Sequence, residues 1–164
     1  MEDGRPVIRL SKLADYGIVM MTHLARQDGR QLATPEIAAA TGVPVPMASK
    51  ILKLLVRGDL LDSQRGAHGG YGLARPARAI TVADVIEVLD GPIAMTSCTE
   101  PGPSECVIES VCSARTNWLR INAAIREALD GITIDEMAHA IPPAFMVAEA
   151  RPRAAGGLLQ ERGQ

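Results

Sequence analysis

Aromatic residues are scarce in this 164-residue chain: they make up 2% of it, whereas 47% of the residues are hydrophobic. A core with so few rings has to be packed by Ala, Leu, Ile, Val and Met. Ala and Leu favour helices over strands. The composition therefore predicts a mainly α-helical fold.

The sequence also lacks the run of about 18 apolar residues that a membrane span requires. Its first residues, MEDGRP, have no basic segment leading into an apolar stretch, so we expect no signal peptide, no membrane association and a cytoplasmic location. Cysteine occurs only three times. An odd number in a reducing compartment argues against structural disulfides and favours metal binding or redox chemistry.

The net charge of −2 is unusual for a nucleic-acid-binding protein, but the charge is unevenly distributed. Residues 1–78 carry 11 Lys and Arg against 7 Asp and Glu, whereas residues 79–164 carry 6 against 12. The first part is therefore net positive and the second net negative, which suggests that only the first part contacts DNA.

Helical spacing of apolar residues predicts a first helix over 10–25. A second, short helix begins with Thr34 as its N-cap and ends at Gly42. A third helix begins after Pro44 and ends at Gly58. Two helices joined by a tight turn predict a helix-turn-helix.

Two short extended segments, 60–64 and 71–73, follow the third helix and flank a glycine-rich loop at 65–70. This pattern predicts a β-hairpin directly after the recognition helix, which is the layout of a winged helix. The loop has no GK[ST] ending and precedes no helix, so it is not interpreted as a phosphate-binding P-loop.

A further helix is predicted from Thr81 to about residue 89, followed by an irregular loop at 93–112. A long helix is expected over 113–129. Thr133 and Glu136 form a predicted capping box for a last short helix that Pro142 and Pro143 would end.

In a helix-turn-helix, the start of the second helix reaches base edges in the major groove, while wing and backbone contacts supply register. The start of the first helix, the start of the third helix and the glycine-rich loop offer residues for these contacts. The candidate DNA contacts are Arg9, Ser11, Lys12, Pro46, Ser49, Lys50, Lys53, Arg65, His68 and Gly69.

Cys98, Cys106 and Cys112 lie in the single loop at 93–112 with the spacing C-x7-C-x5-C. They lack the paired CxxC spacing of a closed structural zinc site, and thiolates are suited to iron–sulfur clusters. Three cysteines leave one ligand position to another group. Zinc binding and three uncoordinated thiols remain alternatives.

Taken together, segments 8–16 and 60–71 and the three-cysteine loop resemble the family of iron–sulfur transcription regulators that includes IscR, NsrR and RirA. The run Cys112-Ser113-Ala114-Arg115-Thr116-Asn117-Trp118 looks most like the branch that regulates the SUF cluster-assembly operon. The resemblance covers residues 8–140. It implies a mainly α winged helix-turn-helix with a long C-terminal dimerisation helix.

The resemblance further implies a homodimer on a palindromic operator, with the interface at Trp118, Ile121, Ile125 and Leu129. Together with the composition of the two ends of the chain, it leads us to expect five regions: an N-terminal extension at 1–7, a winged-helix DNA-binding domain at 8–92, a cluster-binding loop at 93–112, the dimerisation helix with a short C-terminal helix at 113–141, and a flexible tail at 142–164.

Arg115 stands where IscR-like members carry a histidine ligand, so the fourth ligand is open. Asp15 stands where NsrR-like members use an aspartate of the partner subunit, and it is our predicted ligand. Glu105, Glu109 or a small thiol are the alternatives.

We expect a regulator, most simply a repressor, of iron–sulfur assembly or iron homeostasis genes that binds a 2Fe–2S cluster in preference to a 4Fe–4S cluster. The alternative is a winged-helix regulator that responds through thiol oxidation or zinc. No nucleophile–base pair or cofactor loop supports an enzyme, and a cluster-transfer scaffold would not need a wing.

Overall fold

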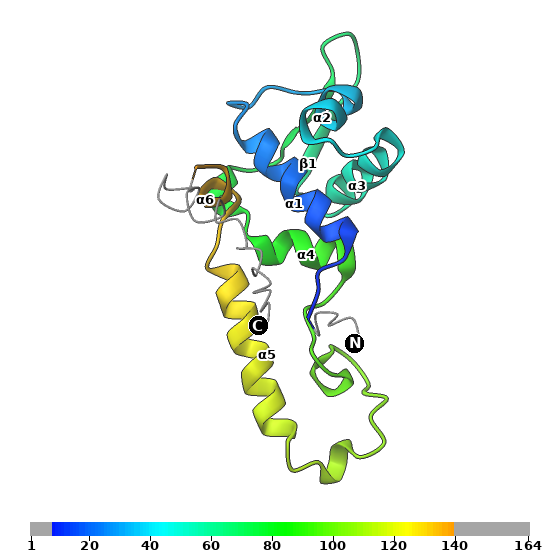
Figure 1. Cartoon of the computed structure of the whole chain (residues 1–164), viewed down its shortest axis with the longest axis vertical. Helices are drawn as coiled ribbons and strands as arrows, with labels where there is room; N and C mark the ends of the chain where they lie inside the picture. Colours follow the sequence, from blue (N-terminus) through cyan, green and yellow to red (C-terminus); the bar gives the residue numbers. More distant parts are fainter. Residues whose placement is uncertain (1–7, 140–164) are drawn as a thin grey trace, which may run out of the picture.

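The computed structural model describes residues 8–139 as a globular helical part from which one long helix extends (Figure 1). The first three helices are α1 (Lys12–Ala25), α2 (Thr34–Thr41) and α3 (Val45–Arg57). The strands β1 (Leu61–Gln64) and β2 (Gly70–Leu73) follow, and then a 3-10 turn, η1 (Ala77–Ala79). Next come α4 (Val82–Asp90), the 3-10 turns η2 (Ser97–Thr99) and η3 (Glu109–Val111), α5 (Arg115–Asp130) and α6 (Ile134–His139).

The expected helix ends are largely the observed ones. Gly42 ends α2 in the left-handed conformation at φ 71°, and Gly58 ends α3. The Thr81 hydroxyl accepts a hydrogen bond from the Asp84 amide, as a capping residue does. The N-cap of α2 was predicted at the wrong residue, because it is Ala33, whose backbone amide donates to the Glu36 carboxylate at 2.8 Å.

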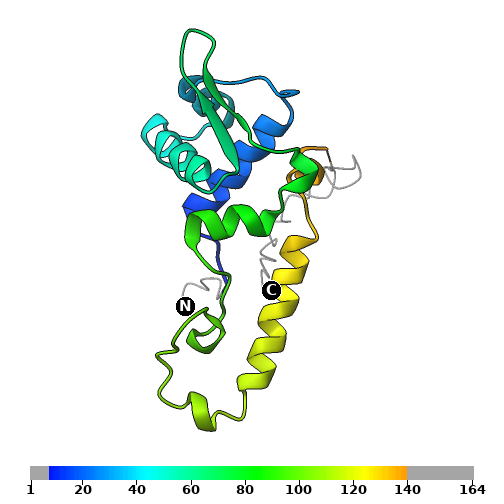
Figure 2. The same ribbon diagram turned by 180° about the vertical axis from the view of Figure 1, so that it is seen from behind.

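The strands β1 and β2 form an antiparallel hairpin in which Leu61 pairs with Leu73 and Gln64 pairs with Gly70. Figure 2 shows the loop between them projecting beyond the helices. Tyr71 also bonds to Leu32 in both directions, at 2.8 and 3.0 Å. The wing is thereby fixed to the segment that precedes α2, and the predicted mainly α winged helix is confirmed.

The core lies where α1, α3, α4 and α6 meet. Its largest fully buried side chains are Met20, Met21, Ile37, Ile51, Leu52, Leu55, Leu60, Leu61, Ile80, Ile134 and Val85. Two glycines allow close helix approaches: a Cβ on Gly17 would overlap Leu89 of α4, and a Cβ on Gly58 would overlap Val88.

The short helix α6 packs within this core, although the sequence groups it with the long helix. Ile134 is fully buried and its amide donates to the Ile80 carbonyl at 2.9 Å. Arg26, the C-cap of α1, donates from Nε to the Ala138 carbonyl at 2.9 Å. The predicted stop at 142–143, the extension at 1–7 and the tail at 142–164 lie outside the described residues.

Among residues 8–139, no single helix has the length and apolar character of a membrane span. Only α2 and α3 taken together, bent by 114° at their junction, meet that measure.

Candidate DNA-binding face and cysteine site

The helix α3 is held by one face and leaves the other accessible. Ala48, Ile51, Leu52 and Leu55 are buried against the core. On the opposite face, Pro46, Lys50 and Lys53 are exposed, and Ser49 is half-buried. An anchored helix with an accessible basic face can lie in the major groove.

The wing presents Arg65 and His68 to solvent, and its glycines set its shape. A Cβ on Gly69 would overlap the Gln64 carbonyl, and one on Gly70 would overlap the Leu32 carbonyl. Only glycine therefore allows the backbone to pass so closely at these two positions.

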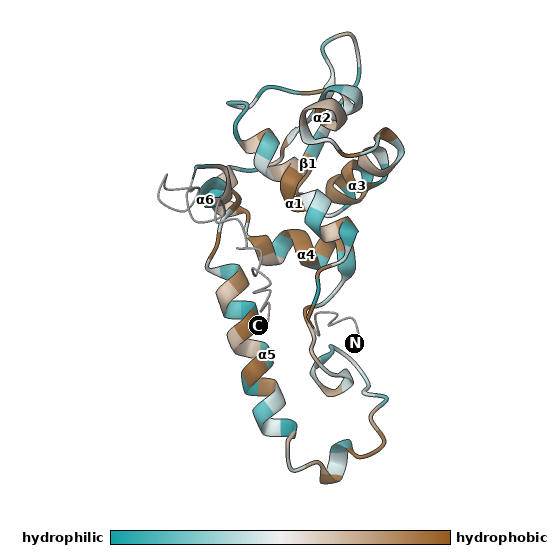
Figure 3. Ribbon diagram, in the orientation of Figure 1, coloured by the Kyte–Doolittle hydropathy of each residue, from teal (hydrophilic) through white to brown (hydrophobic). Residues whose placement is uncertain are grey.

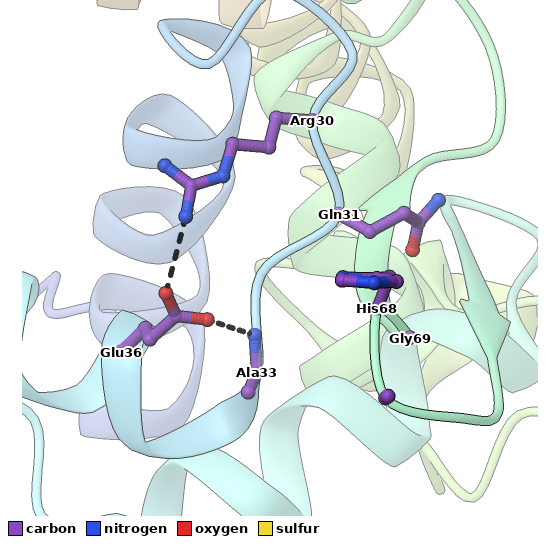
Figure 4. Close-up of a pocket in the computed structure, with 7 residues that line it drawn as sticks. Arg30, Gln31, Ala33, Glu36, His68 and Gly69 are labelled. Carbon is purple, nitrogen blue, oxygen red and sulfur yellow. Dashed lines mark hydrogen bonds and ion pairs between the residues drawn. The ribbon is translucent and has the colours of Figure 1, made fainter.

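A hollow of about 410 Å³ separates the wing from the start of α2 (Figure 4). Its wall on the α2 side carries Glu36, whose carboxylate accepts from the Ala33 amide and from Arg30 at 3.3 Å. The opposite wall is formed by His68 and Gly69 of the wing. The carboxylate is thus already partnered, which limits its repulsion of a passing phosphate.

The start of α1 is less open to DNA than the sequence suggests. Arg9 and Lys12 are exposed, but the Ser11 hydroxyl accepts from the Ala14 amide at 3.0 Å and donates to Asp90 at 2.6 Å. Ser11 therefore caps α1 and joins it to the end of α4. The Asp90 carboxylate also brings a negative charge to this point.

The predicted DNA-binding cations keep their charges available. Within residues 8–139, none of Arg9, Lys12, Lys50, Lys53 and Arg65 forms an ion pair. Unpaired exposed cations are free to exchange solvent for phosphate oxygens.

The three cysteines are free thiols and all are half-buried. Cys98 lies in η2, where its Sγ is 3.2 Å from the Thr96 hydroxyl. Cys106 and Cys112 flank η3 and line one hollow of about 530 Å³ with Glu109 and Arg115. The structure therefore brings two of the three thiols to a common space, and Cys98 does not line it.

No group of three or more His, Cys, Asp or Glu side chains is positioned to hold a metal ion in the part of the chain that the structure describes. Asp15, the predicted fourth ligand, is exposed in the first turn of α1 and is not part of the hollow. A ligand donated by a second subunit would not be visible in one chain, so its assignment stays a prediction.

Arg115, at the position of the histidine ligand in IscR-like proteins, is bound to Glu109. Its Nε donates to the Glu109 carboxylate at 3.0 Å. Hydrogen bonding from Ser104, opposed by partial desolvation and aided by Arg115, lowers the pKa of Glu109. Arg115 therefore lines the hollow shared by Cys106 and Cys112 as a cation that is already paired with Glu109.

The helix α5 has no buried residue, although apolar positions recur along its length (Figure 3). Ile121 is 45% exposed, whereas Trp118, Ile125 and Leu129 are half-buried and Leu129 packs against the core. These four residues are the predicted dimer interface, and their role in a dimer stays a prediction.

Sequence reasoning missed the contacts that hold α5 in place. Asn122 donates to the Ile93 carbonyl and accepts from the Met95 amide, both at 3.0 Å. Arg126 forms a two-pronged ion pair with Glu87 of α4. The spacing of Glu87 and Arg126 in the sequence carries no signal, because the contact forms only once α5 turns back along α4.

The comparisons with known proteins agree with this geometry. Residues 10–140 match the family profile described as "Rrf2: Iron-dependent Transcriptional regulator". Protein aau3 of Rhizobium meliloti is 36% identical over 135 residues, which cover 82% of this chain and 88% of aau3.

Two solved structures have the same fold over most of the described chain. CymR, the global cysteine regulator of B. subtilis, superposes with a TM-score of 0.67 at 30% identity, covering 83% of this chain and 100% of CymR. T. potens IscR superposes with a TM-score of 0.62 at 27% identity, covering 91% and 95%. The profile match and these relatives show that the chain belongs to the Rrf2 family of transcriptional regulators.

Proposed function

We propose that this Rrf2-family regulator binds an iron–sulfur cluster through Cys98, Cys106 and Cys112 and represses cluster-assembly or iron homeostasis genes in the cytoplasm. The observation that carries the proposal is the placement of three free thiols in the single loop that joins the winged helix to α5. The iron-dependent description of the family profile supports it.

The donor chemistry of the loop fits such a group. Thiolates are soft ligands, and cysteines are the usual ligands of iron–sulfur clusters. Cys106 and Cys112 already share one hollow, and Cys98 lies in a three-residue 3-10 turn of the same loop. A bound cluster would supply a centre sensitive to iron, oxygen or redox state. We propose 2Fe–2S in preference to 4Fe–4S, with Asp15 of the partner subunit as the fourth ligand.

The DNA-binding part of the proposal places α3 in the major groove and the wing beside it. Ser49, Lys50 and Lys53 would face bases and phosphates, and Arg65 and His68 would lie at the minor groove. Pairing of two α5 helices would relate the two α3 helices by a two-fold axis, which requires a palindromic operator. Cluster loss would then change the spacing of the two α3 helices.

The first test is anaerobic purification followed by an absorption spectrum and assays for iron and acid-labile sulfide. We expect a coloured protein with about equal amounts of iron and sulfide. Replacement of any one cysteine by Ala should abolish the colour. A colourless protein after anaerobic reconstitution would refute the cluster and leave the DNA-binding assignment intact.

The second test concerns DNA. The Lys50→Ala/Arg65→Ala double variant should lose about 1–3 kcal/mol of operator binding for each lost contact. Cluster-bound and cluster-free protein should also differ in operator affinity at equal salt. Equal affinity of the two forms would refute sensing through the cluster.

A second candidate is a regulator that responds through oxidation of the thiols or through zinc. It is favoured by the position of Cys98, which does not line the hollow of Cys106 and Cys112. The similarity to Staphylococcus aureus CymR, which was solved in an oxidized form, gives it further support. Zinc without acid-labile sulfide, or a Cys106–Cys112 disulfide after mild oxidation, would select this candidate.

A further inference from the structure

A small hollow of about 230 Å³ lies between α3 and the wing hairpin. It is lined by Lys53, Val56, Arg57, Ser63 and Tyr71. The exposed wall of this space is mostly apolar, and two cations and two hydroxyl-bearing residues contribute to its lining. Of these five residues, only Lys53 was predicted from the sequence to contact DNA.

Regular structure brings these side chains together. Lys53 and Arg57 are four residues apart on α3, so they project from one face of the helix. Ser63 and Tyr71 are direct partners in the β1–β2 register, so they share one face of the hairpin. The bridge from Tyr71 to Leu32 holds the hairpin in place against the rest of the fold.

The charges in this hollow are not used elsewhere in the fold. Neither Lys53 nor Arg57 forms an ion pair with another residue in the range 8–139. Arg57 lies in the last turn of α3, where a cation is favourable because of the helix dipole. That interaction does not occupy the guanidinium donors, which remain free for an anion.

We infer that this hollow binds one phosphodiester group of the DNA backbone where a strand passes from the major groove at α3 to the minor groove at the wing. The inference rests on the proposed DNA-binding mode and adds Arg57, Ser63 and Tyr71 to it. Lys53 and Arg57 supply charge, and the two hydroxyls donate to phosphate oxygens. Such a contact sets the register of the protein on the duplex and reads no base.

The test is the salt dependence of binding to a fluorescent duplex of random sequence and to a duplex selected for tight binding by the wild-type protein. Each of Lys53→Ala and Arg57→Ala should lower the slope of log K against log salt by about 1. Each of these variants should bind both duplexes more weakly than the wild-type protein, and the loss of affinity should be the same for the two duplexes. Tyr71→Phe should lower the affinity for both duplexes by about three- to tenfold with the slope unchanged, because it removes a neutral donor.

Arg78→Ala is the matched control, since Arg78 is exposed in η1 and does not line the hollow; it should behave as wild type. Inorganic phosphate should compete with DNA no better than sulfate at equal ionic strength, because the hollow binds a phosphate held in a duplex. Stronger competition by phosphate would instead assign the hollow to a free anion. Wild-type slopes in folded Lys53→Ala and Arg57→Ala proteins would overturn this inference alone, whereas a wild-type protein that binds neither duplex would overturn the proposed function as well.

Discussion

At the scale of single residues, Gly17 shows how one missing side chain sets a helix crossing. Ala favours helices by about 1 kcal/mol over Gly, yet a Cβ at Gly17 would overlap Leu89 of α4. We expect Gly17→Ala to lower the free energy of unfolding by about 1–3 kcal/mol, as overpacking does. Urea denaturation measures the change. In the Gly17→Ala/Leu89→Ala double variant, the overlap is relieved, so the two losses should not add; simple additivity would contradict the explanation.

Glu136 gives a residue-scale prediction for pH. Hydrogen bonds from the backbone amide and then the hydroxyl of Thr133 lower its pKa below the ordinary glutamate value of 4.5. Folding thus favours the ionised carboxylate, so its contribution is complete above that value and is lost as the pH falls through the lower folded pKa. Glu136→Gln should reduce stability at neutral pH and flatten the acid side of a melting-temperature profile. An unchanged profile would show that the capping box adds nothing.

At the scale of elements, α5 stands out because none of its residues is buried although it carries an apolar stripe. A helix of this kind gains most of its stability from a partner surface. Ile121→Glu should therefore shift a dimer to a monomer in light scattering, since it places a charge in the proposed interface. Ala123→Glu is the control, because Ala123 is exposed on the opposite side of α5. Equal masses for the two variants would place the interface elsewhere.

At the scale of the whole molecule, α5 is connected to the start of the 93–112 loop through Asn122 and to α4 through the Arg126–Glu87 pair. Asn122→Ala removes two hydrogen bonds, each with a net contribution of about 0.5–1.5 kcal/mol. We expect limited proteolysis within 93–112 to become several-fold faster, because local opening is less costly. Asn117→Ala, at the exposed start of α5, should leave the cleavage rate unchanged. Equal rates in both variants would mean that Asn122 does not restrain the loop.

Features of the fold that neighbouring residues determine could be predicted from the sequence, whereas contacts between residues far apart in the chain could not. Helix ends at Gly42 and Gly58 and the capping residue Thr81 were predictable, because neighbouring residues determine them. The approach of Gly17 to Leu89 was not, since it depends on a crossing of two helices far apart in the chain.

The candidate site divides in the same way. The exposed basic residues of α3 and the wing could be predicted from the periodicity of the core-facing positions. The role of Ser11 as a partner of Asp90 and the pairing of Arg115 with Glu109 could not, because a side chain's partner depends on the fold around it. Residue spacing alone likewise does not determine which of the three thiols share a hollow.

The hydrogen bonds of Asn122 to Ile93 and Met95 close the cysteine-bearing segment into a ring. A tethered ring confines its three thiols to a small volume, so each has a high effective concentration with respect to the others. The entropic free-energy cost of closing a loop grows only with the logarithm of its length, by about 0.6 kcal/mol for each doubling. The spacing between the cysteines can therefore change at little energetic cost while the ring stays closed, and Asn122 is the contact nearest the cysteines that keeps it closed.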